Sequence, residues 1–299
     1  MPELPEVENL RRGLEKKIVD QKILSVKVSK PKLVWGKGNF RKISKIKVKE
    51  FELGLTGEQF SKIERRAKNL IFRFKSGKIL LIHLKMSGQF VYKSNKGDKK
   101  IIGGHPIEIS ETQLPNKHTH IIFKLQKGNL YYNDTRMFGY LLYYPNIKRF
   151  EEENHFALLG LEPFDKKFTI KYLREALNRK RGKIKSVLMD QKVVTGLGNI
   201  YADESLFEAK IHPERPAHLI NKSEAEHLYK VIQRIMRRAI KLGGSSVATY
   251  RLLDENRGNY AREHKVYGKE GHKCSRCGKT LKRILIQNRT TIFCPNCQR

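Results

Sequence analysis

Long apolar segments are missing from this 299-residue sequence. No run of apolar residues approaches the roughly 18 that a membrane-spanning helix needs. The first residues, MPELPEVENL, are acidic and lack the basic and apolar regions of a signal peptide. These absences argue against a membrane or secreted protein, so we expect an intracellular, cytoplasmic one.

Acidic residues are also scarce. The chain has 30 Asp and Glu against 62 Lys and Arg, a net charge of +32, and the basic residues occur along its whole length. Such an excess repels itself and destabilises the compact state unless an anion neutralises it. The composition therefore predicts a polyanionic partner. An anionic membrane is the alternative, and the lack of apolar segments disfavours it.

Cysteine is rare and unevenly placed. The four cysteines form two close pairs near the C-terminus, Cys274-x-x-Cys277 and Cys294-x-x-Cys297. This spacing predicts a tetrahedral site for one structural Zn²⁺ per chain. Two disulfides are the alternative, which a reducing compartment disfavours. Four thiolates leave no open coordination position for water or substrate. We therefore expect this zinc to stabilise the local fold, and any catalytic site to lie elsewhere in the chain.

The N-terminal half of the sequence is typical of a β-sandwich or barrel-like domain. Its strand-like runs are Ile23–Val28, Leu70–Phe74, Ile79–Leu84, Ile121–Leu125 and Leu130–Tyr132. Before them, apolar residues recur at helical spacing from Val7 to Ile18, with Pro5 and Glu6 in the expected first turn. The Gly-, Lys- and Asn-containing segment from Gly88 to Asn116 predicts a long insertion between strands.

The C-terminal half is predicted to be helical. Ser223 and Glu226 fit a capping box, and the apolar stripe that follows ends at Gly243-Gly244. Farther upstream, Gly196-x-Gly198-Asn199 separates two apolar helical stretches and predicts a helix-turn-helix. Backbone N–H groups at such a turn are able to bind DNA phosphates, and an ordinary turn is the alternative interpretation.

From residue 2 to residue 299 the sequence resembles the formamidopyrimidine-DNA glycosylases. The opening MPELPEVE and the segments RRAKNL, HLKMSG and DTRMFG match the family's N-terminal half. MDQKVVTGLGNIYADESLF matches its helix-two-turn-helix element, AKIHPERPA follows as expected, and VYGKEGHKCSRCG with CPNCQR resembles its zinc finger.

The resemblance implies an α+β fold in four parts. These are a catalytic two-layered β-sandwich with flanking helices over residues 1–145, a linker over 146–165, a helical helix-two-turn-helix domain over 166–264, and a β-hairpin zinc finger over 265–299. It also implies a monomeric base-excision repair enzyme that acts on oxidised purines or abasic sites in double-stranded DNA, in a bacterial-type cytoplasm.

Pro2 is the implied nucleophile. Removal of Met1 would leave a secondary amine, whose reference pKa of about 8 leaves an appreciable neutral fraction near neutral pH. The Schiff base formed at C1′ is an iminium and a strong electron sink, so one residue serves base excision and strand cleavage by β,δ-elimination. Glu3 is the implied acid/base residue and Glu6 a supporting carboxylate. By sequence alone both acids would be explained as helix N-terminal charge.

The resemblance also implies roles in eliminating the phosphates and in holding the DNA. Lys68 would assist the first elimination, and Arg289, in a predicted hairpin turn within QNRTTIF, the second. Met86, Arg136 and Phe138 correspond to the trio that fills the gap left by the flipped nucleotide. The implied phosphate contacts are His118, Arg136, Lys180, Lys185, Asn199 and Arg289.

The sequence departs from the family pattern in places. The connection from Gly88 to His118 is longer than usual, and Thr135 and Met137 stand where proline and a basic residue are common. GGSSVATYRLLDENRGNYARE corresponds to the loop that covers the flipped base. Two other interpretations stay open. One is an endonuclease VIII-type glycosylase for oxidised pyrimidines, which typically has glycine where Leu4 stands. The other is a non-catalytic zinc-containing DNA-binding protein, which would have no use for Pro2 and Glu3.

Overall fold

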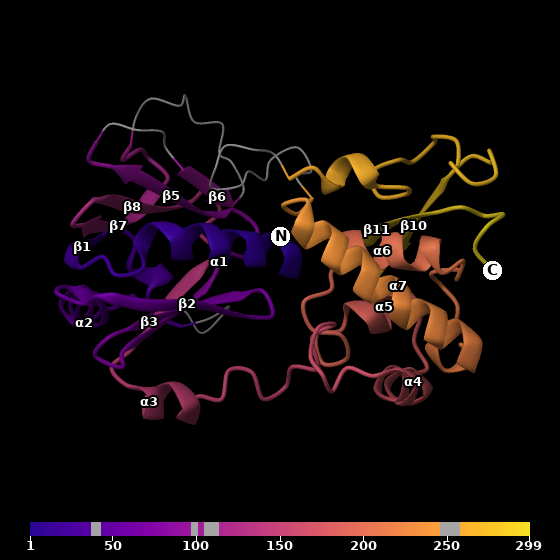
Figure 1. The fold of residues 1–299 in the computed structure, drawn as a ribbon, viewed down its shortest axis with the longest axis horizontal. Helices are drawn as coiled ribbons and strands as arrows, with labels where there is room; N and C mark the ends of the chain where they lie inside the picture. The colour runs from indigo at the N-terminus through magenta and orange to yellow at the C-terminus, as the bar shows by residue number, and fades with distance from the viewer. Residues whose placement is uncertain (37–42, 97–100, 105–113, 246–257) are drawn as a thin grey trace. The chain divides into compact units, whose positions relative to one another are not determined.

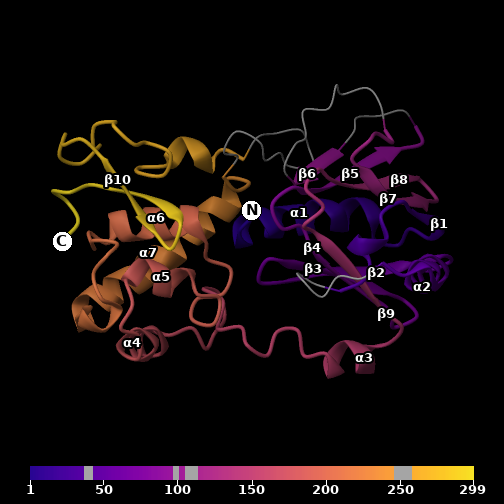
Figure 2. The same ribbon diagram turned by 180° about the vertical axis from the view of Figure 1, so that it is seen from behind.

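The chain divides into two compact units (Figures 1 and 2). The structure is a computed structural model that describes residues 1–36, 43–96, 101–104, 114–245 and 258–299. One unit comprises Met1–His155 with Gly243–Asn259, and the other Phe156–Leu242 with Tyr260–Arg299. The cysteine-containing segment thus shares a unit with the helices. No helix within the described ranges is long and apolar enough to cross a membrane.

Two antiparallel sheets build the N-terminal unit, which confirms the predicted two-layered sandwich and α+β class. One sheet has the strand order β1-β7-β8-β5-β6 and the other β2-β3-β4-β9; Figure 2 shows β4 and β9 from behind. The strands are β1 Ile23–Val28, β2 Phe60–Arg66, β3 Asn69–Phe74, β4 Ile79–His83, β5 Gly88–Ser94, β6 Ile101–Gly104, β7 Thr119–Leu125, β8 Gly128–Asp134 and β9 Tyr140–Tyr144. Phe72 and Phe90, one from each sheet, meet in the shared apolar core with ring centroids 5.8 Å apart.

Helix α1 (Leu4–Ile18) fixes the N-terminus to this sandwich. Its residues Val7, Leu10, Leu14 and Ile18 are buried, as the helical spacing predicts. The helix contacts β2 and β3 of one sheet and β6 of the other, and it runs between the sheets in Figure 1. The smaller helices of this unit are η1 Pro31–Leu33, α2 Lys45–Leu55 and α3 Ile147–Glu152.

The insertion predicted from Gly88 to Asn116 begins as sheet, so that part of the prediction is wrong. Strand β5 pairs with β8 on one side and β6 on the other. Its apolar residues Phe90, Val91 and Tyr92 are all buried: Phe90 and Tyr92 belong to the core between the two sheets, and Val91 lies on the opposite face of the strand. The flanking Gly, Lys and Asn residues had suggested a loop. Residues 97–100 and 105–113 of this segment lie outside the described ranges.

The second unit holds four α-helices and a hairpin within its described residues. They are α4 Ile170–Asn178, α5 Ile184–Met189, α6 Asn199–Glu208, α7 Lys222–Lys241, β10 Lys282–Ile286 and β11 Arg289–Phe293, with short helices η3 Ala217–Leu219 and η4 Tyr260–Glu263. The predicted glycine turn is present between α5 and α6. Gly196 has φ +92°, and Gly198 is the residue before α6.

Helix α7 starts two residues earlier than the sequence analysis predicted. Its capping box consists of Asn221 and Glu224, not Ser223 and Glu226. Both pairs fit the capping pattern, but only Asn221 has the extended backbone of a residue that precedes a helix. The predicted apolar stripe from Leu228 to Ile240 is buried except for Ile240, which is half-buried.

Candidate functional site

The N-terminal residues form a closed hydrogen-bonded cap on α1. Pro2 is buried, and Glu3 and Glu6 are only 4% and 2% exposed. Glu6 Oε2 accepts the Glu3 backbone N–H at 2.9 Å, and the Glu3 side chain accepts the Glu6 backbone N–H in return. Both carboxylates therefore satisfy helix N–H groups, as the helix-charge interpretation expects, while they lie beside Pro2.

A distant segment of the chain also binds Glu6. The second oxygen of Glu6 accepts the Ser245 backbone N–H at 2.8 Å. Gly244, with φ +82°, approaches so closely that a Cβ there would lie 2.8 Å from Glu6 Oε1. One carboxylate thus joins the peptide after Pro2 to residues 244 and 245. The following residues 246–257, most of the loop predicted to cover a flipped base, lie outside the described ranges.

Four charged side chains act on the N-terminal amine. Burial lowers the pKa of the Met1 amine below its ordinary value of 8.0, and the carboxylates of Glu3 and Glu6 oppose this effect. The positive charges of Lys68 and Arg136 lower the pKa further. The structure thus brings together in one place the predicted nucleophile end, both predicted carboxylates, Lys68 and Arg136.

Lys68 is presented by a two-residue turn between β2 and β3. Arg66 pairs with Asn69, so Ala67 and Lys68 make the turn, with Ala67 at φ +56°. Arg65 donates to the Ala67 carbonyl oxygen at 3.0 Å and pairs with Glu8 of α1 at 3.2 Å. These contacts tie the turn to the helix that carries Glu3 and Glu6. Lys68 is only 6% exposed.

Asp134, which the sequence analysis missed, joins two of the predicted DNA-contacting loops. It is fully buried, and its carboxylate accepts the Ser87 hydroxyl and, at 2.7 Å, the Gly139 backbone N–H. The Ser87 hydroxyl in turn accepts the Arg136 backbone N–H at 3.1 Å. The signal in the sequence was an Asp at the end of a strand, followed by a turn that ends in glycine.

The predicted gap-filling residues stand on these two loops. Met86, beside Ser87, is half-buried. Phe138 is 53% exposed, and the Arg136 guanidinium lies over its ring at 5.8 Å from the centroid. His118 is half-buried, and its carbonyl oxygen accepts the Asp134 N–H at 3.0 Å. Phe138 is too exposed to be a core residue. An exposed aromatic ring on a turn that is held in place could insert between DNA bases.

The other predicted DNA contacts lie in the second unit. Asn199 is the first residue of α6, and Lys180 pairs with Asp190 at 3.3 Å. Arg289 begins β11 directly after a two-residue turn of Gln287 and Asn288, both at positive φ, which matches the predicted hairpin turn. It is exposed.

Lys185 is placed unlike the other predicted phosphate contacts. Its side chain is fully buried and forms an ion pair with Asp203 at 2.7 Å. Its ammonium also donates to Thr290 and Thr291 of β11. Burial raises the pKa of the Asp203 carboxyl to about 7, against the opposing charge and hydrogen bond of Lys185.

The four cysteine sulfurs converge. All lie within 4.8 Å of one another, with Cys274–Cys297 at 3.9 Å and Cys277–Cys294 at 3.5 Å. A tetrahedral site with zinc–sulfur bonds of about 2.3 Å requires sulfurs about 3.8 Å apart, so the geometry fits that metal. The sulfurs are too distant for disulfide bonds of about 2.05 Å, and the cysteines are free. The cluster could therefore bind one metal ion.

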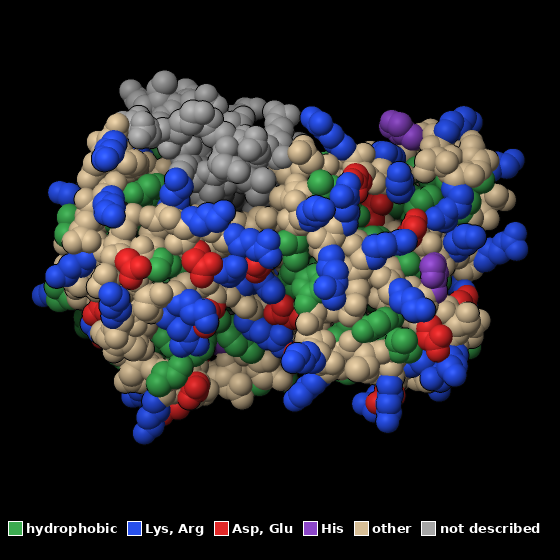
Figure 3. All heavy atoms as spheres, viewed as in Figure 1, with side chains coloured by type: hydrophobic (Ala, Val, Ile, Leu, Met, Phe, Trp, Pro, Cys, Tyr) green, Lys and Arg blue, Asp and Glu red, His purple; other side chains and the backbone are tan. Residues whose placement is uncertain are grey.

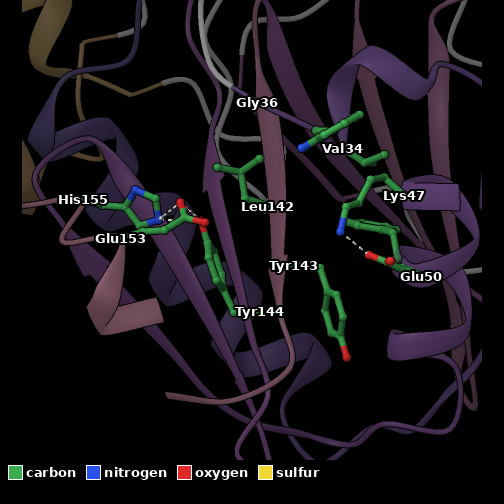
Figure 4. A pocket seen from close by; sticks show the side chains of 11 residues that line it. Val34, Gly36, Lys47, Glu50, Leu142, Tyr143, Tyr144, Glu153 and His155 are labelled. Atoms are coloured by element: carbon green, nitrogen blue, oxygen red, sulfur yellow. Dashed lines mark hydrogen bonds and ion pairs between the residues drawn. The ribbon is translucent and has the colours of Figure 1, made fainter. Parts of the chain in front are cut away.

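A separate cavity of about 650 Å³ lies in the N-terminal unit (Figure 4). Val34, Lys47 and Leu142 are among its lining residues, as is Tyr144, which donates to Glu153 at 2.8 Å. Burial raises the pKa of Tyr144. None of the predicted catalytic or DNA-contacting residues is among those that line it, so this cavity is separate from the candidate site.

Basic side chains are scattered over the visible face of each unit in Figure 3. They are not gathered in one tail or element, as the sequence analysis noted. This distribution fits an extended polyanionic ligand better than a single anion.

Comparisons with known proteins agree with the sequence resemblance. Residues 1–141 match the formamidopyrimidine-DNA glycosylase N-terminal domain, and residues 159–251 match the H2TH domain of the same family. The chain is 37% identical to the formamidopyrimidine-DNA glycosylase of Desulfitobacterium hafniense, with 100% of both chains covered. It is 39% identical to that of Lactococcus lactis subsp. cremoris, covering 100% of this chain and 99% of the relative.

Solved structures of the Lactococcus lactis Fpg protein are similar over the whole chain. Its complex with DNA containing an abasic site matches with a TM-score of 0.84 and 37% identity over 99% of both chains. Its complex with DNA containing N7-benzyl-Fapy-dG matches with a TM-score of 0.84 and 37% identity over 100% of both.

Proposed function

The chain belongs to the formamidopyrimidine-DNA glycosylase family, and from this premise we propose that it excises oxidised purines from double-stranded DNA and then cleaves the strand. The proposed substrates are 8-oxoguanine, formamidopyrimidines and abasic sites. One observation carries the proposal: Pro2 and Glu3 are buried beside Glu6, and the Met1 amine that precedes them has a pKa lowered by burial and by the charges of Lys68 and Arg136.

Pro2 would act as the nucleophile after Met1 is removed. Its neutral amine attacks C1′, and the bond to the damaged base breaks. The amine then loses its proton and the C1′–O4′ bond opens to give an iminium, while Glu3 supplies the proton that the leaving base or the sugar O4′ takes up. The resulting iminium draws electrons from the sugar. Loss of a C2′ proton then expels the 3′ phosphate, and loss of the C4′ proton next expels the 5′ phosphate. We assign assistance of these two steps to Lys68 and Arg289.

The remaining side chains would hold the DNA. Phosphate contacts are proposed for His118, Arg136, Lys180 and Asn199, because each lies at a loop or helix start. Met86 and Phe138 would fill the gap left by the flipped nucleotide, which suits the exposure of Phe138. The loops that present Met86, Arg136 and Phe138 are joined by the hydrogen bonds of Asp134 and Ser87. We therefore expect these three residues to keep fixed relative positions.

The four cysteines would hold one structural Zn²⁺. A thiolate set of this kind closes the metal's coordination shell, so the metal stabilises the hairpin rather than supplying chemistry at the lesion. We propose that the protein works as a monomer in a bacterial-type cytoplasm.

Borohydride trapping tests the proposal. The protein, with loss of Met1 verified by mass spectrometry, is incubated with three labelled duplexes containing an abasic site, 8-oxoguanine or an oxidised pyrimidine; an undamaged duplex is the control. We expect covalent trapping on the first two, with Pro2 as the linked residue. Trapping on the oxidised pyrimidine in preference to 8-oxoguanine would instead identify an endonuclease VIII-type enzyme. No trapping on any duplex would indicate a non-catalytic DNA-binding protein.

A further inference from the structure

The second unit contains a buried ion pair that the proposed chemistry does not use. The side chains of Lys185 on α5 and Asp203 on α6 are 0% and 1% exposed, and their charged atoms lie 2.7 Å apart. Burying two charges is costly, and such pairs are often no more stabilising than apolar residues of the same size. Their best-attested use is to select one arrangement among several.

Both partners bind the strand that begins with Arg289. Lys185 Nζ donates to the Thr290 carbonyl oxygen at 3.1 Å and to Thr291 Oγ1 at 2.7 Å. Thr291 Oγ1 in turn donates to the Arg289 carbonyl oxygen at 3.2 Å. Asp203 accepts the Ile292 backbone N–H at 3.4 Å. Four consecutive residues of β11 are therefore connected to this one pair.

Asn199 also forms a hydrogen bond with the same strand. Its side-chain amide donates to the Thr290 carbonyl oxygen at 3.0 Å. A two-stranded hairpin is at best marginally stable alone, and the outer part of this one is exposed. The register of β11 against α5 and α6 therefore depends on these contacts.

We propose that Lys185 is a positioning residue and not a phosphate contact: the Lys185–Asp203 pair fixes β11 so that Arg289 is held at the DNA. This inference rests on the proposed function of Arg289. An ammonium group has three N–H donors, and Asp203, Thr290 and Thr291 supply an acceptor for each. A phosphate would have to displace one of them inside the protein.

The test compares Lys185→Met with Lys183→Met and Arg289→Ala. Lys183 is the matched control, because it lies just before α5 in the same unit, is 48% exposed and pairs with Glu214. On a labelled abasic duplex at saturating protein, Lys185→Met should lower the ratio of second to first elimination product about tenfold, as when one charge-assisted contact is lost. Trapping at Pro2 should match the parent, and Lys183→Met should leave the product ratio unchanged.

Salt dependence separates positioning from direct contact. Arg289→Ala should reduce the salt slope of DNA binding by about one unit. Adding Lys185→Met to it should change neither slope nor product ratio further, because Lys185 acts through Arg289. A further fall of about one unit would show that Lys185 itself contacts a phosphate, and would overturn the inference.

Amide hydrogen exchange gives a readout that does not need activity. Thr291 and Ile292 should exchange about tenfold faster in Lys185→Met with zinc retained. Parental exchange and a parental product ratio together would overturn the inference. If Lys185→Met fails to fold, Lys185→Met with Asp203→Leu removes both charges and should fold with the same losses. If the parent itself is not trapped, the proposed function fails, and exchange still decides whether the pair holds β11.

Discussion

Glu6→Gln tests whether one carboxylate positions the nucleophile. Glu6 binds two backbone N–H groups with its two oxygens, at Glu3 and at Ser245. Glutamine keeps one accepting oxygen and turns an NH₂ group toward the other N–H. The change therefore breaks one of the two links and leaves its buried donor unsatisfied, while size and shape are conserved.

The magnitude follows from these contacts. A hydrogen bond to a charged group contributes roughly 1.5–3 kcal/mol, and an unsatisfied buried N–H costs about 1–3 kcal/mol. We expect the free energy of unfolding to fall by about 2–4 kcal/mol. If the lost link frees the peptide after Pro2, the rate of Schiff-base formation should fall about 10- to 100-fold, at about 1.4 kcal/mol per tenfold.

The pH dependence gives a second expectation with a definite sign. The Glu6 charge raises the pKa of the amine at the N-terminus, and after Met1 is removed we expect the same charge to act on Pro2. Removing it lowers that pKa. Because the neutral amine is the nucleophile, the rise of trapping rate with pH should move to lower pH while the plateau falls.

The assay is single-turnover borohydride trapping on an abasic duplex over a range of pH, alongside thermal unfolding. Glu8→Gln is the matched control, since Glu8 is also in the first part of α1 but pairs with arginines. It should lower stability without moving the pH profile. A folded Glu6→Gln protein with the parental rate and an unmoved profile would refute the reasoning.

Three further outcomes are expected. Glu3→Gln should bind duplexes containing 8-oxoguanine but fail to release the base in a gel assay; excision at the parental rate would leave Glu3 with only its helix-capping role. Cys294→Ser should abolish zinc binding, worth on the order of 10 kcal/mol of apparent folding free energy in finger peptides, and weaken DNA binding with a shallower salt slope, while circular dichroism shows the helices intact; retained zinc and full affinity would contradict this. Burial, with the charge of Lys269, lowers the pKa of His264 to about 4 from 6.5. The unfolded chain therefore binds a proton in that range that the folded one does not, and stability should fall by about 3 kcal/mol as pH drops from 6.5 to 4. In urea titrations His264→Phe should lose that part of the pH dependence, and an unchanged slope would show that His264 is not responsible.

The local features of this protein were readable from its sequence. The cysteine spacing predicted the sulfur cluster, Gly196 and Gly198 predicted the turn before α6, and the spacing from Val7 to Ile18 predicted the buried face of α1. The position of Arg289 after a hairpin turn was also predicted. Each depends on residues within one or two turns of chain, where spacing and backbone preference determine the geometry.

The resemblance to a known family identified the candidate site residues, but it did not show which contacts keep them in position. Nothing near Asp134 in the sequence indicates that it braces the Ser87 loop, and Glu6 and Ser245 are 239 positions apart. The residues that flank Phe90–Tyr92 favour a loop, whereas β5 forms by pairing with β6 and β8 and buries Phe90 and Tyr92 in the core between the sheets. These contacts exist only once distant segments pack together.

The sequence by itself determined the chemistry available, namely a proline behind Met1, neighbouring carboxylates, paired cysteines and an excess of basic residues. Tertiary structure decided which of those groups face solvent. Lys180 and Lys185 are alike in a sequence of 62 basic residues, yet one is half-exposed and the other fully buried against Asp203. The difference arises because a charge enters the interior only where folding brings it an opposite charge and enough hydrogen-bond acceptors.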